Sequence, residues 1–155
     1  MNTAALEQIR NYYRIDGHIA TAGQPTVDQF HTIKRADFDL VINLALPDSP
    51  VAIPDEGDLV RLLGMDYIHI PVDFGAPTFT DLHAFFATVD QHQDKKIFIH
   101  CAYNWRVSVF MYLYKRIRQQ VAASDALPTL HAVWDPDKTW QQFIQSALTY
   151  YHMQD

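Results

Sequence analysis

Short apolar runs alternate with longer amphipathic stretches along this chain. Each run has the length of a strand and is bounded by polar, glycine or proline residues, which is typical of strands buried on both faces of a sheet. Four such runs predict strands at His18–Ala22, Leu40–Leu46, Tyr67–Val72 and Ile97–His100.

Apolar residues recur at helical spacing between and after these runs. At the N-terminus one predicted helical face carries Leu6, Ile9, Tyr12 and Tyr13. Thr26 is a predicted N-cap, with Gln29 three residues later as its capping-box partner, and that helix is expected to run to Asp37. Further helices are predicted over Leu59–Gly64, Thr78–Gln93, Trp105–Val121, Leu127–Val133 and Thr139–Tyr151.

Strands that alternate with helices predict an α/β fold. We expect one domain, residues 1–155, with a central, mainly parallel sheet of four to five strands flanked by helices. In such sheets, sites form at the carboxyl ends of the strands. Three predicted strand ends carry Asn43, Asp73 and Cys101, so these residues are the first candidates for a site.

Composition narrows the function. The formal net charge is −6 and no basic arm is present, which argues against a nucleic-acid partner. No apolar run approaches the length of a membrane span, and the N-terminal MNTAALEQIRNYY lacks the apolar segment of a signal peptide. The single cysteine permits no internal disulfide. These features predict a cytoplasmic protein without a membrane partner.

The stretch Lys95–Val109, KKIFIHCAYNWRVSV, places that cysteine between a predicted strand and a predicted helix. Unpaired amides at a helix N-terminus lower the pKa of a thiol and also bind oxyanions such as phosphate. Arg106, which is separated from Cys101 by four residues, can add a two-pronged contact to the same anion. A lone cysteine is more often a small buried hydrophobe, but the neighbouring His100 and Tyr103 favour a reactive thiol.

Three segments resemble a known family. HCAYNWR resembles the phosphate-binding loop of the cysteine-dependent protein phosphatases of the tyrosine and dual-specificity class. IPVDFGAP, at Ile70–Pro77, is similar to the segment that carries the general-acid aspartate in compact dual-specificity phosphatases. AGQP, at Ala22–Pro25, followed by a helix and VINL, resembles the opening of the bacterial β-lactamase-hydrolase-like phosphatase family. The resemblance implies a dual-specificity-phosphatase-like fold and a phosphomonoester hydrolase.

The resemblance also implies roles for the residues of the loop and for an acid elsewhere in the chain. Cys101 is the expected nucleophile, which forms a phosphocysteine intermediate, and Asp73 is the expected general acid, with Asp48 as the alternative. His100 and Ser108 are expected to support the loop. The phosphoryl group is expected to bind to the main chain of the loop and to the guanidinium, that is, to Ala102, Tyr103, Asn104, Trp105 and Arg106.

The loop departs from the family pattern in three places. It is one residue shorter between Cys101 and Arg106 than in most of these phosphatases, a spacing that also occurs in rhodaneses. Asn104 replaces a glycine, and asparagine tolerates a positive φ. Val107 replaces a hydroxyl residue, which comes one position later as Ser108. Two alternatives therefore stay open, namely a rhodanese-like sulfurtransferase and a non-catalytic phosphate- or sulfate-binding module.

The remaining candidates concern the surroundings of the loop. Gln24 and Asn43 are predicted either to border the pocket or to have ordinary turn and strand-end roles. Tyr103 and Trp105 are predicted to form an aromatic wall or to pack against the closing helix. The eight histidines show no ligand spacing, so no metal and no cofactor is expected. The expected partner is a phosphorylated protein or a small phosphoester; the sequence leaves the oligomeric state open.

Overall fold

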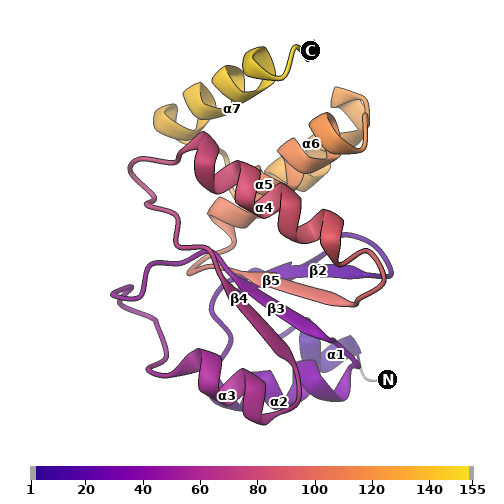
Figure 1. Ribbon diagram of the computed structural model, residues 1–155, viewed down its shortest axis with the longest axis vertical. Coiled ribbons are helices and arrows are strands. Elements are labelled where there is room, and N and C mark those ends of the chain that lie inside the picture. The colour runs from indigo at the N-terminus through magenta and orange to yellow at the C-terminus, as the bar shows by residue number, and fades with distance from the viewer. Residues whose placement is uncertain (1–2, 154–155) are drawn as a thin grey trace.

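The computed structural model describes residues 3–153 and contains a five-stranded sheet with helices on both faces (Figure 1). Its strands lie in the order β1-β2-β5-β3-β4. The four larger strands are parallel, and β1 pairs antiparallel with β2. The predicted α/β class and mainly parallel sheet are confirmed. The strands are β1 Tyr13–Arg14, β2 Ile19–Ala22, β3 Leu40–Asn43, β4 Asp66–His69 and β5 Ile97–His100.

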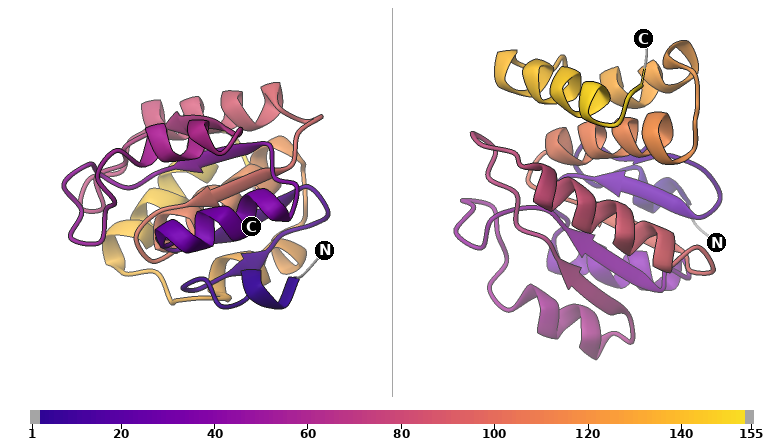
Figure 2. Two further views of the ribbon diagram at one scale, coloured as in Figure 1. Left: turned by 90° about the horizontal axis from the view of Figure 1, so that it is seen from below. Right: turned by 45° about the horizontal axis from the view of Figure 1, so that its top comes forward.

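Two layers of helices cover the sheet, as Figure 2 shows from two further directions. One face carries α1 to α3, and the other carries α4 to α7. The bounds are α1 Thr3–Leu6, α2 Val27–Arg35, α3 Glu56–Leu62, α4 Phe79–Gln91, α5 Trp105–Leu113, the π-helix η1 Tyr114–Arg118, α6 Ala123–His131 and α7 Lys138–Tyr150. No helix among residues 3–153 is long and apolar enough to cross a bilayer.

The apolar runs supply both cores because strand side chains alternate between faces. In β5, Ile97 and Ile99 belong to the core under α4 to α7, whereas Phe98 belongs to the core under α1 to α3. Leu40 and Val41 of β3 divide in the same way. Continuous hydrophobic runs were the correct signal for strands that are buried on both sides.

Thr26 caps α2 as the sequence predicts. Its hydroxyl accepts a hydrogen bond from the Gln29 amide at 3.1 Å, and the Gln29 side chain accepts one from the Thr26 amide at 3.0 Å. This capping box satisfies two main-chain donors at the start of the helix. It sets where α2 leaves the end of β2, beside the site described below.

The predicted N-terminal helical face is wrong beyond Leu6. Helix α1 ends at Leu6, Asn11 has a left-handed φ of 51°, and Tyr13 lies in β1, opposite Thr21 of β2. The Asn11 side chain donates a hydrogen bond to the Tyr103 carbonyl at 2.8 Å. Pairing with β2 therefore decides the structure at Tyr13, although the spacing of the apolar residues is helical.

Other boundaries of strands and helices also differ from the prediction. Strands β3 and β4 end at Asn43 and His69, earlier than expected, although the buried Leu44 and Val72 continue the apolar pattern into the following loops. Leu44 still donates a main-chain hydrogen bond to the His100 carbonyl, and Val72 donates one to the Leu44 carbonyl, but neither residue belongs to a regular strand. Hydrophobicity alone therefore overstated the strand lengths. Helix α3 begins at Glu56, before the predicted start, and α5 changes to the π-helix η1 after Leu113 instead of continuing to Val121 as one α-helix.

Candidate active site

The thiol lies where β5 turns into α5. His100 is the last residue of β5, in register with Asn43 of β3 and Ala22 of β2, so the loop that follows emerges at the centre of the carboxyl edge of the sheet. Asn104 precedes α5 with a left-handed φ of 67°, as expected for an asparagine that replaces glycine. Its side-chain nitrogen donates to the Thr21 hydroxyl at 3.0 Å, which ties the turn to β2.

The loop carbonyls point outward to donors in neighbouring segments. The Cys101 carbonyl accepts a hydrogen bond from His100 Nδ1 at 3.1 Å, and the Ala102 carbonyl accepts one from the Gln24 amide at 3.0 Å. No described peptide bond is cis, so each N–H points opposite to the C=O of the same peptide group. The amides of Ala102 and Tyr103 therefore point away from these outer donors.

The start of α5 adds further free amides. Trp105, Arg106 and Val107 form the first helical turn, where amides have no carbonyl four residues earlier to bond to. These amides carry the positive end of the helix dipole, which attracts an anion. The loop thus presents hydrogen-bond donors from two sources, namely the amides of Ala102 and Tyr103 and the amides at the N-terminus of α5.

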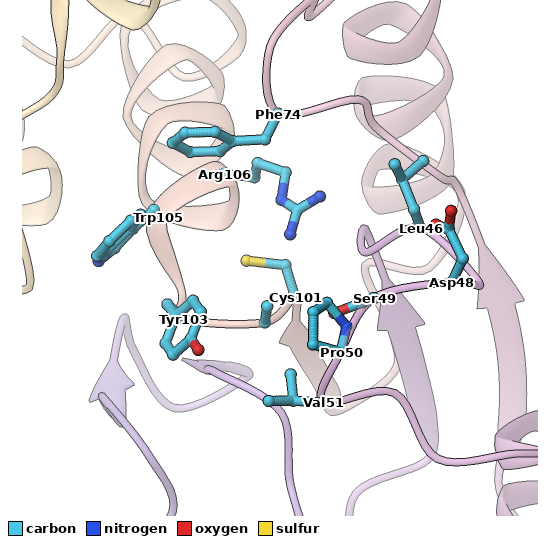
Figure 3. A pocket seen from close by; sticks show the side chains of 11 residues that line it. Leu46, Asp48, Ser49, Pro50, Val51, Phe74, Cys101, Tyr103, Trp105 and Arg106 are labelled. Carbon is cyan, nitrogen blue, oxygen red and sulfur yellow. The ribbon is translucent and has the colours of Figure 1, made fainter.

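A cavity of about 410 Å³ opens beside the loop (Figure 3). Cys101 has no solvent-exposed surface, yet its sulfur points into this cavity together with the Arg106 guanidinium. The thiol is therefore buried at the floor of an anion-sized hollow and is not enclosed in the apolar core. The lining consists of Leu46, Asp48, Ser49, Pro50, Val51, Phe74, Cys101, Ala102, Tyr103, Trp105 and Arg106.

Arg106 is a buried cation with spare hydrogen-bonding capacity. It is 7% exposed, its Nη1 donates to the Val72 carbonyl at 2.9 Å, and its Nε has no partner in the structure. Its guanidinium carbon lies 5.8 Å from the centre of the Phe74 ring. Among residues 3–153 no carboxylate lies within ion-pairing distance of it. A buried guanidinium with unused donors is suited to bind an oxyanion.

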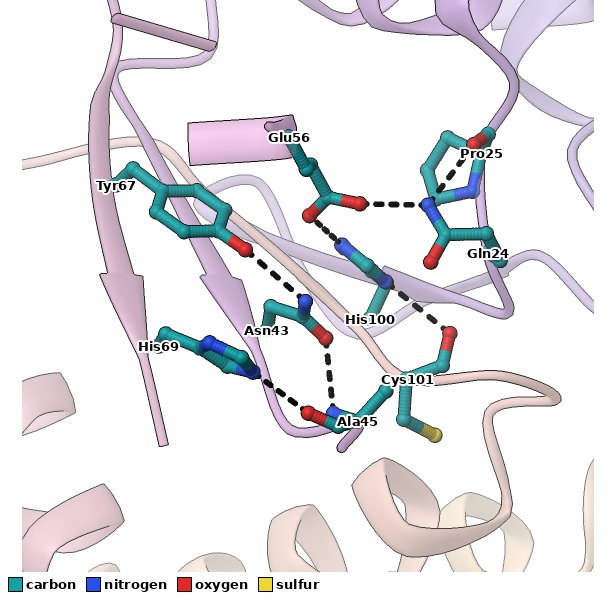
Figure 4. Close-up of polar contacts among 9 residues, drawn as sticks. All are labelled: Gln24, Pro25, Asn43, Ala45, Glu56, Tyr67, His69, His100 and Cys101. Carbon is teal, nitrogen blue, oxygen red and sulfur yellow. Dashed lines mark hydrogen bonds and ion pairs between the residues drawn. The ribbon is translucent and has the colours of Figure 1, made fainter. Parts of the chain in front are cut away.

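His100 is held from behind by a buried carboxylate (Figure 4). Its Nε2 lies 2.7 Å from Oε2 of Glu56, which is 5% exposed, and Gln24 Nε2 donates to the other carboxylate oxygen at 2.7 Å. Burial raises the pKa of Glu56, but the charge of His100 and hydrogen bonds from His100, Gln24 and Tyr67 outweigh this effect and lower it overall. Gln24 therefore supports the loop from outside and does not line the cavity.

Sequence reasoning missed Glu56. An acidic residue in the first turn of a short helix normally faces water and interacts with the helix dipole. Nothing near Glu56 in the sequence indicates that it meets His100, which lies 44 residues later. Asn43, the other residue of uncertain role, donates to the Tyr67 hydroxyl at 3.0 Å and accepts from the Ala45 amide at 2.8 Å. Asn43 thus has the predicted strand-end role.

The two candidate acids occupy different places. Asp48 is exposed and lines the cavity. Asp73 is exposed outside the lining, and its Oδ1 accepts a hydrogen bond from the Gly75 amide at 2.9 Å. Its neighbours on either side, Val72 and Phe74, both contact Arg106. Asp73 is therefore at the rim of the site, and the structure does not bring its carboxylate to the thiol.

Ser108 supports an aromatic wall. Its hydroxyl donates to the Trp105 carbonyl at 2.8 Å and accepts from Trp134 Nε1 at 2.9 Å. The Trp105 and Trp134 rings stack 5.0 Å apart at an interplanar angle of 6°, and Tyr103 lies 5.3 Å from Trp105. Tyr103 and Trp105 therefore form the predicted aromatic wall of the cavity, and Trp105 packs on Trp134 in the segment before α7 and not on the closing helix itself. Val107 is fully buried.

Metal-ligating side chains do not gather near the loop. Over the described part of the chain, no group of three or more His, Cys, Asp or Glu side chains is arranged to hold a metal ion.

This fold and loop define a class of proteins. The crystal structure of Tk-PTP in its active form superimposes with a TM-score of 0.75 at 20% identity, over 88% of this chain and 95% of that chain. The catalytic core of the Saccharomyces cerevisiae PP-IP phosphatase SIW14 gives 0.72 at 18% identity, over 88% and 85%. At these identities the likeness establishes the fold, which is that of the cysteine-dependent tyrosine and dual-specificity phosphatases.

A more similar structure shows the family. A crystal structure from Shewanella putrefaciens CN-32, described as "Putative phosphatase (DUF442)", has a TM-score of 0.86 and 35% identity, and the match covers 97% of this chain and 99% of that chain. The protein belongs to the DUF442 family, and the superfamily resemblance of its sequence is confirmed. No family model and no curated protein matches the chain.

Proposed function

We propose that this protein is a phosphomonoester hydrolase that acts through a phosphocysteine intermediate on Cys101. One observation carries the proposal: the Cys101 sulfur and the Arg106 guanidinium point into the same cavity, at the N-terminus of α5. A nucleophile and an anion-binding group are thereby placed side by side. The DUF442 relative from Shewanella putrefaciens, whose description reads "Putative phosphatase", supports the assignment as a phosphatase.

The chemistry proceeds in two displacements. The Cys101 thiolate attacks phosphorus, the S–P bond forms, and the P–O bond to the leaving alcohol breaks with its electron pair on oxygen. That oxygen takes a proton from a general acid. Water then attacks the phosphocysteine, gives its proton to the same group, and releases inorganic phosphate with the thiolate restored.

The loop stabilises the charge on the phosphoryl oxygens during both steps. The outward-turned carbonyls of Cys101 and Ala102 leave the next amides facing the opposite side, and the first turn of α5 adds its unpaired amides. Arg106 contributes two or more donors from its planar fork. Removal of one such preorganised donor typically costs about 10²–10³ in rate.

Asp73 is the proposed general acid, and Asp48 remains the alternative. Asp73 follows Val72, whose carbonyl accepts a hydrogen bond from Arg106, so Asp73 lies next to the segment that contacts the anion-binding group. Asp48 has the advantage of lying in the cavity lining already. The two acids are separated experimentally in the Discussion.

The lining favours an aryl or otherwise apolar phosphomonoester, from a protein or a small molecule. Phe74, Tyr103 and Trp105 form much of the wall. Among the lining residues Arg106 is the single cation, and Asp48 is an acid that repels additional negative charge. A substrate with one phosphoryl group on an aromatic alcohol fits this lining better than a highly charged polyphosphate does.

The test is a panel of phosphoesters assayed with the wild-type protein and with Cys101→Ser. We expect a burst of 4-nitrophenol from 4-nitrophenyl phosphate, a mass increase of one phosphoryl group on the protein during turnover, and loss of both in Cys101→Ser. Unchanged turnover in Cys101→Ser would contradict the proposal. Thiocyanate formation from thiosulfate and cyanide indicates sulfur transfer, which the short Cys101–Arg106 spacing favours. Stoichiometric phosphate binding without product indicates a binding module.

A further inference from the structure

We propose that Glu56 is a positioning residue that holds His100 doubly protonated directly behind the Cys101 loop. The inference deepens the proposed function and rests on Cys101 as the reactive group. Glu56 does not touch the cavity, so any influence on the thiol must act through His100. The contacts of the imidazole ring carry the argument.

The two ring nitrogens of His100 meet different partners. Nδ1 lies 3.1 Å from the Cys101 carbonyl, which can only accept, so Nδ1 carries a proton. Nε2 lies 2.7 Å from a carboxylate oxygen of Glu56, and this contact needs a second proton, on either Nε2 or the carboxyl group. The pair is therefore imidazolium with carboxylate, or neutral imidazole with carboxylic acid.

The partners of Glu56 decide between these two states. Gln24 Nε2 donates to Oε1 at 2.7 Å, and a hydrogen bond with the Tyr67 hydroxyl also stabilises the ionised carboxylate. A carboxylate accepts several donors, whereas a protonated carboxyl group must itself donate. The donors from Gln24 and Tyr67 stabilise the negative charge of Glu56 and so favour the ionised carboxylate. The shared proton accordingly resides on His100.

The backbone before α3 is shaped for this contact. Asp55 has a left-handed φ of 59°, a conformation that residues other than glycine rarely adopt, and it makes no side-chain cap hydrogen bond. It is followed by the buried Glu56. A Cβ on Gly57 would lie 2.9 Å from the Tyr67 ring, so glycine is needed where Tyr67 crosses the first turn. The left-handed backbone at Asp55 and the close contact between Gly57 and Tyr67 thus flank the buried carboxylate of Glu56.

The imidazolium acts on the thiol in two ways. Its positive charge is one residue from Cys101 and is buried, with no exposed surface. Its hydrogen bond to the Cys101 carbonyl also polarises that peptide group, which strengthens the Ala102 amide as a donor. Both effects favour the thiolate over the thiol.

Other groups packed against the pair come from several elements. Phe30 of α2 meets the His100 ring edge-on at 5.9 Å between ring centres. Tyr67 of β4 is titratable, and burial together with the charge of Glu56 raises its pKa far above the neutral range. Arg61 of α3 lies over the outer side of Tyr67, with its guanidinium carbon 5.6 Å from the ring centre. Among these neighbours, Glu56 is the carboxylate that contacts the His100 ring directly.

The test is the pH profile of Cys101 alkylation by iodoacetamide in the wild-type protein and in Glu56→Gln. The glutamine side chain can donate to an unprotonated Nε2, so the hydrogen bond survives without the second proton on His100. We expect the pKa of the thiol to rise by about 1–2 units in Glu56→Gln, with about a tenfold loss of alkylation rate per unit at acidic pH. Asp90→Asn is the matched control, since it removes a carboxylate that pairs with Arg118 away from the cavity.

A folded Glu56→Gln protein with the wild-type alkylation profile would overturn the inference. If the variant does not fold, nitrogen-15 NMR of the wild-type His100 ring decides the question. Protons on both ring nitrogens at pH 7 to 8 support the inference, and an unprotonated Nε2 overturns it. Alkylation needs no turnover, so the outcomes are separable: an acidic wild-type thiol without hydrolysis contradicts the proposed function alone, whereas an unchanged thiol in Glu56→Gln contradicts the role of Glu56.

Discussion

Arg106 shows how a single residue links the loop to its surroundings. It belongs to the first turn of α5, lines the cavity, and reaches the Val72 carbonyl on the segment that carries Asp73. Burial of a guanidinium beside one carbonyl and without a carboxylate is costly unless an anion completes it. Arg106 is therefore positioned to bind an anion and contributes little to the stability of the fold through ion pairing.

The first prediction concerns the shape of this cation. Arg106→Lys keeps the positive charge but loses the planar fork, so we expect kcat/KM for 4-nitrophenyl phosphate to fall about 10²–10³-fold. Steady-state kinetics measure the loss, and Arg118→Lys, at the Asp90 ion pair, is the control. Retention of activity within about threefold would show that a point charge suffices.

The second prediction separates the two candidate acids. We expect Asp73→Asn to lower kcat about 10²–10⁴-fold for an alkyl phosphate, and less for 4-nitrophenyl phosphate, whose leaving group needs little protonation. Asp48→Asn is expected to change binding more than kcat because Asp48 lines the cavity. If the larger, leaving-group-dependent loss occurs in Asp48→Asn instead, Asp48 is the acid.

At the scale of elements, the site is made where β2, β5 and α5 meet. The β5–α5 loop carries the thiol, but the β2–α2 connection fixes its shape: the Gln24 amide bonds to the Ala102 carbonyl, and Gly23 lies against Tyr103. A Cβ on Gly23 would lie 2.6 Å from the Ala102 carbonyl oxygen and 3.1 Å from the Tyr103 Cα. Backbone atoms cannot move aside as a flexible side chain can.

The third prediction follows from this close approach. Gly23→Ala is expected to displace the loop, to lower the free energy of unfolding by about 1–3 kcal/mol, and to weaken phosphate binding. Chemical denaturation and phosphate titration measure the two effects. Gly17→Ala is the control, since its added Cβ would meet only the end of Arg14 at 4.0 Å. Wild-type stability and phosphate affinity in Gly23→Ala would contradict the proposed packing.

At the scale of the whole molecule, the two hydrophobic cores support different parts of the site. The core under α1 to α3 backs the Glu56–His100 pair, and the larger core under α4 to α7 anchors α5 through residues such as Phe110 and Trp140. Half-buried polar contacts join the helices of the second layer. Tyr114 of η1 donates to Asp90 of α4 at 2.7 Å and accepts from Gln93 at 3.0 Å.

The fourth prediction uses that contact. Burial, with the hydrogen bond and charge of Asp90, raises the pKa of Tyr114 to about 12. The unfolded chain loses this proton near pH 10, so the stabilisation is complete below that pH and is lost as pH rises toward 12. We expect the free energy of unfolding to fall over this interval, and to fall less steeply in Tyr114→Phe. Urea denaturation at each pH measures both slopes; equal slopes would contradict the shift.

Much of the architecture could be read from local signals. The apolar runs of β2 and β5, the Thr26 capping box and the helix α4 appear where they were predicted. The Cys101–Arg106 loop and the left-handed turn at Asn104 were also recognisable, because each depends on residues adjacent in the sequence. The N-terminal segment was not, since Tyr13 is in a strand only because β2 pairs with it.

The sequence by itself determined the order of the strands and helices other than β1 and η1, the Cys101–Arg106 loop and the family resemblance, because hydrophobic period, caps and turn residues act over a few positions. Only the tertiary structure decided that Glu56 meets His100, that Gly23 presses on the loop, and that Asp48 rather than Asp73 lines the cavity. These contacts join residues far apart in the chain. They depend on how the elements pack, and no local pattern encodes that packing.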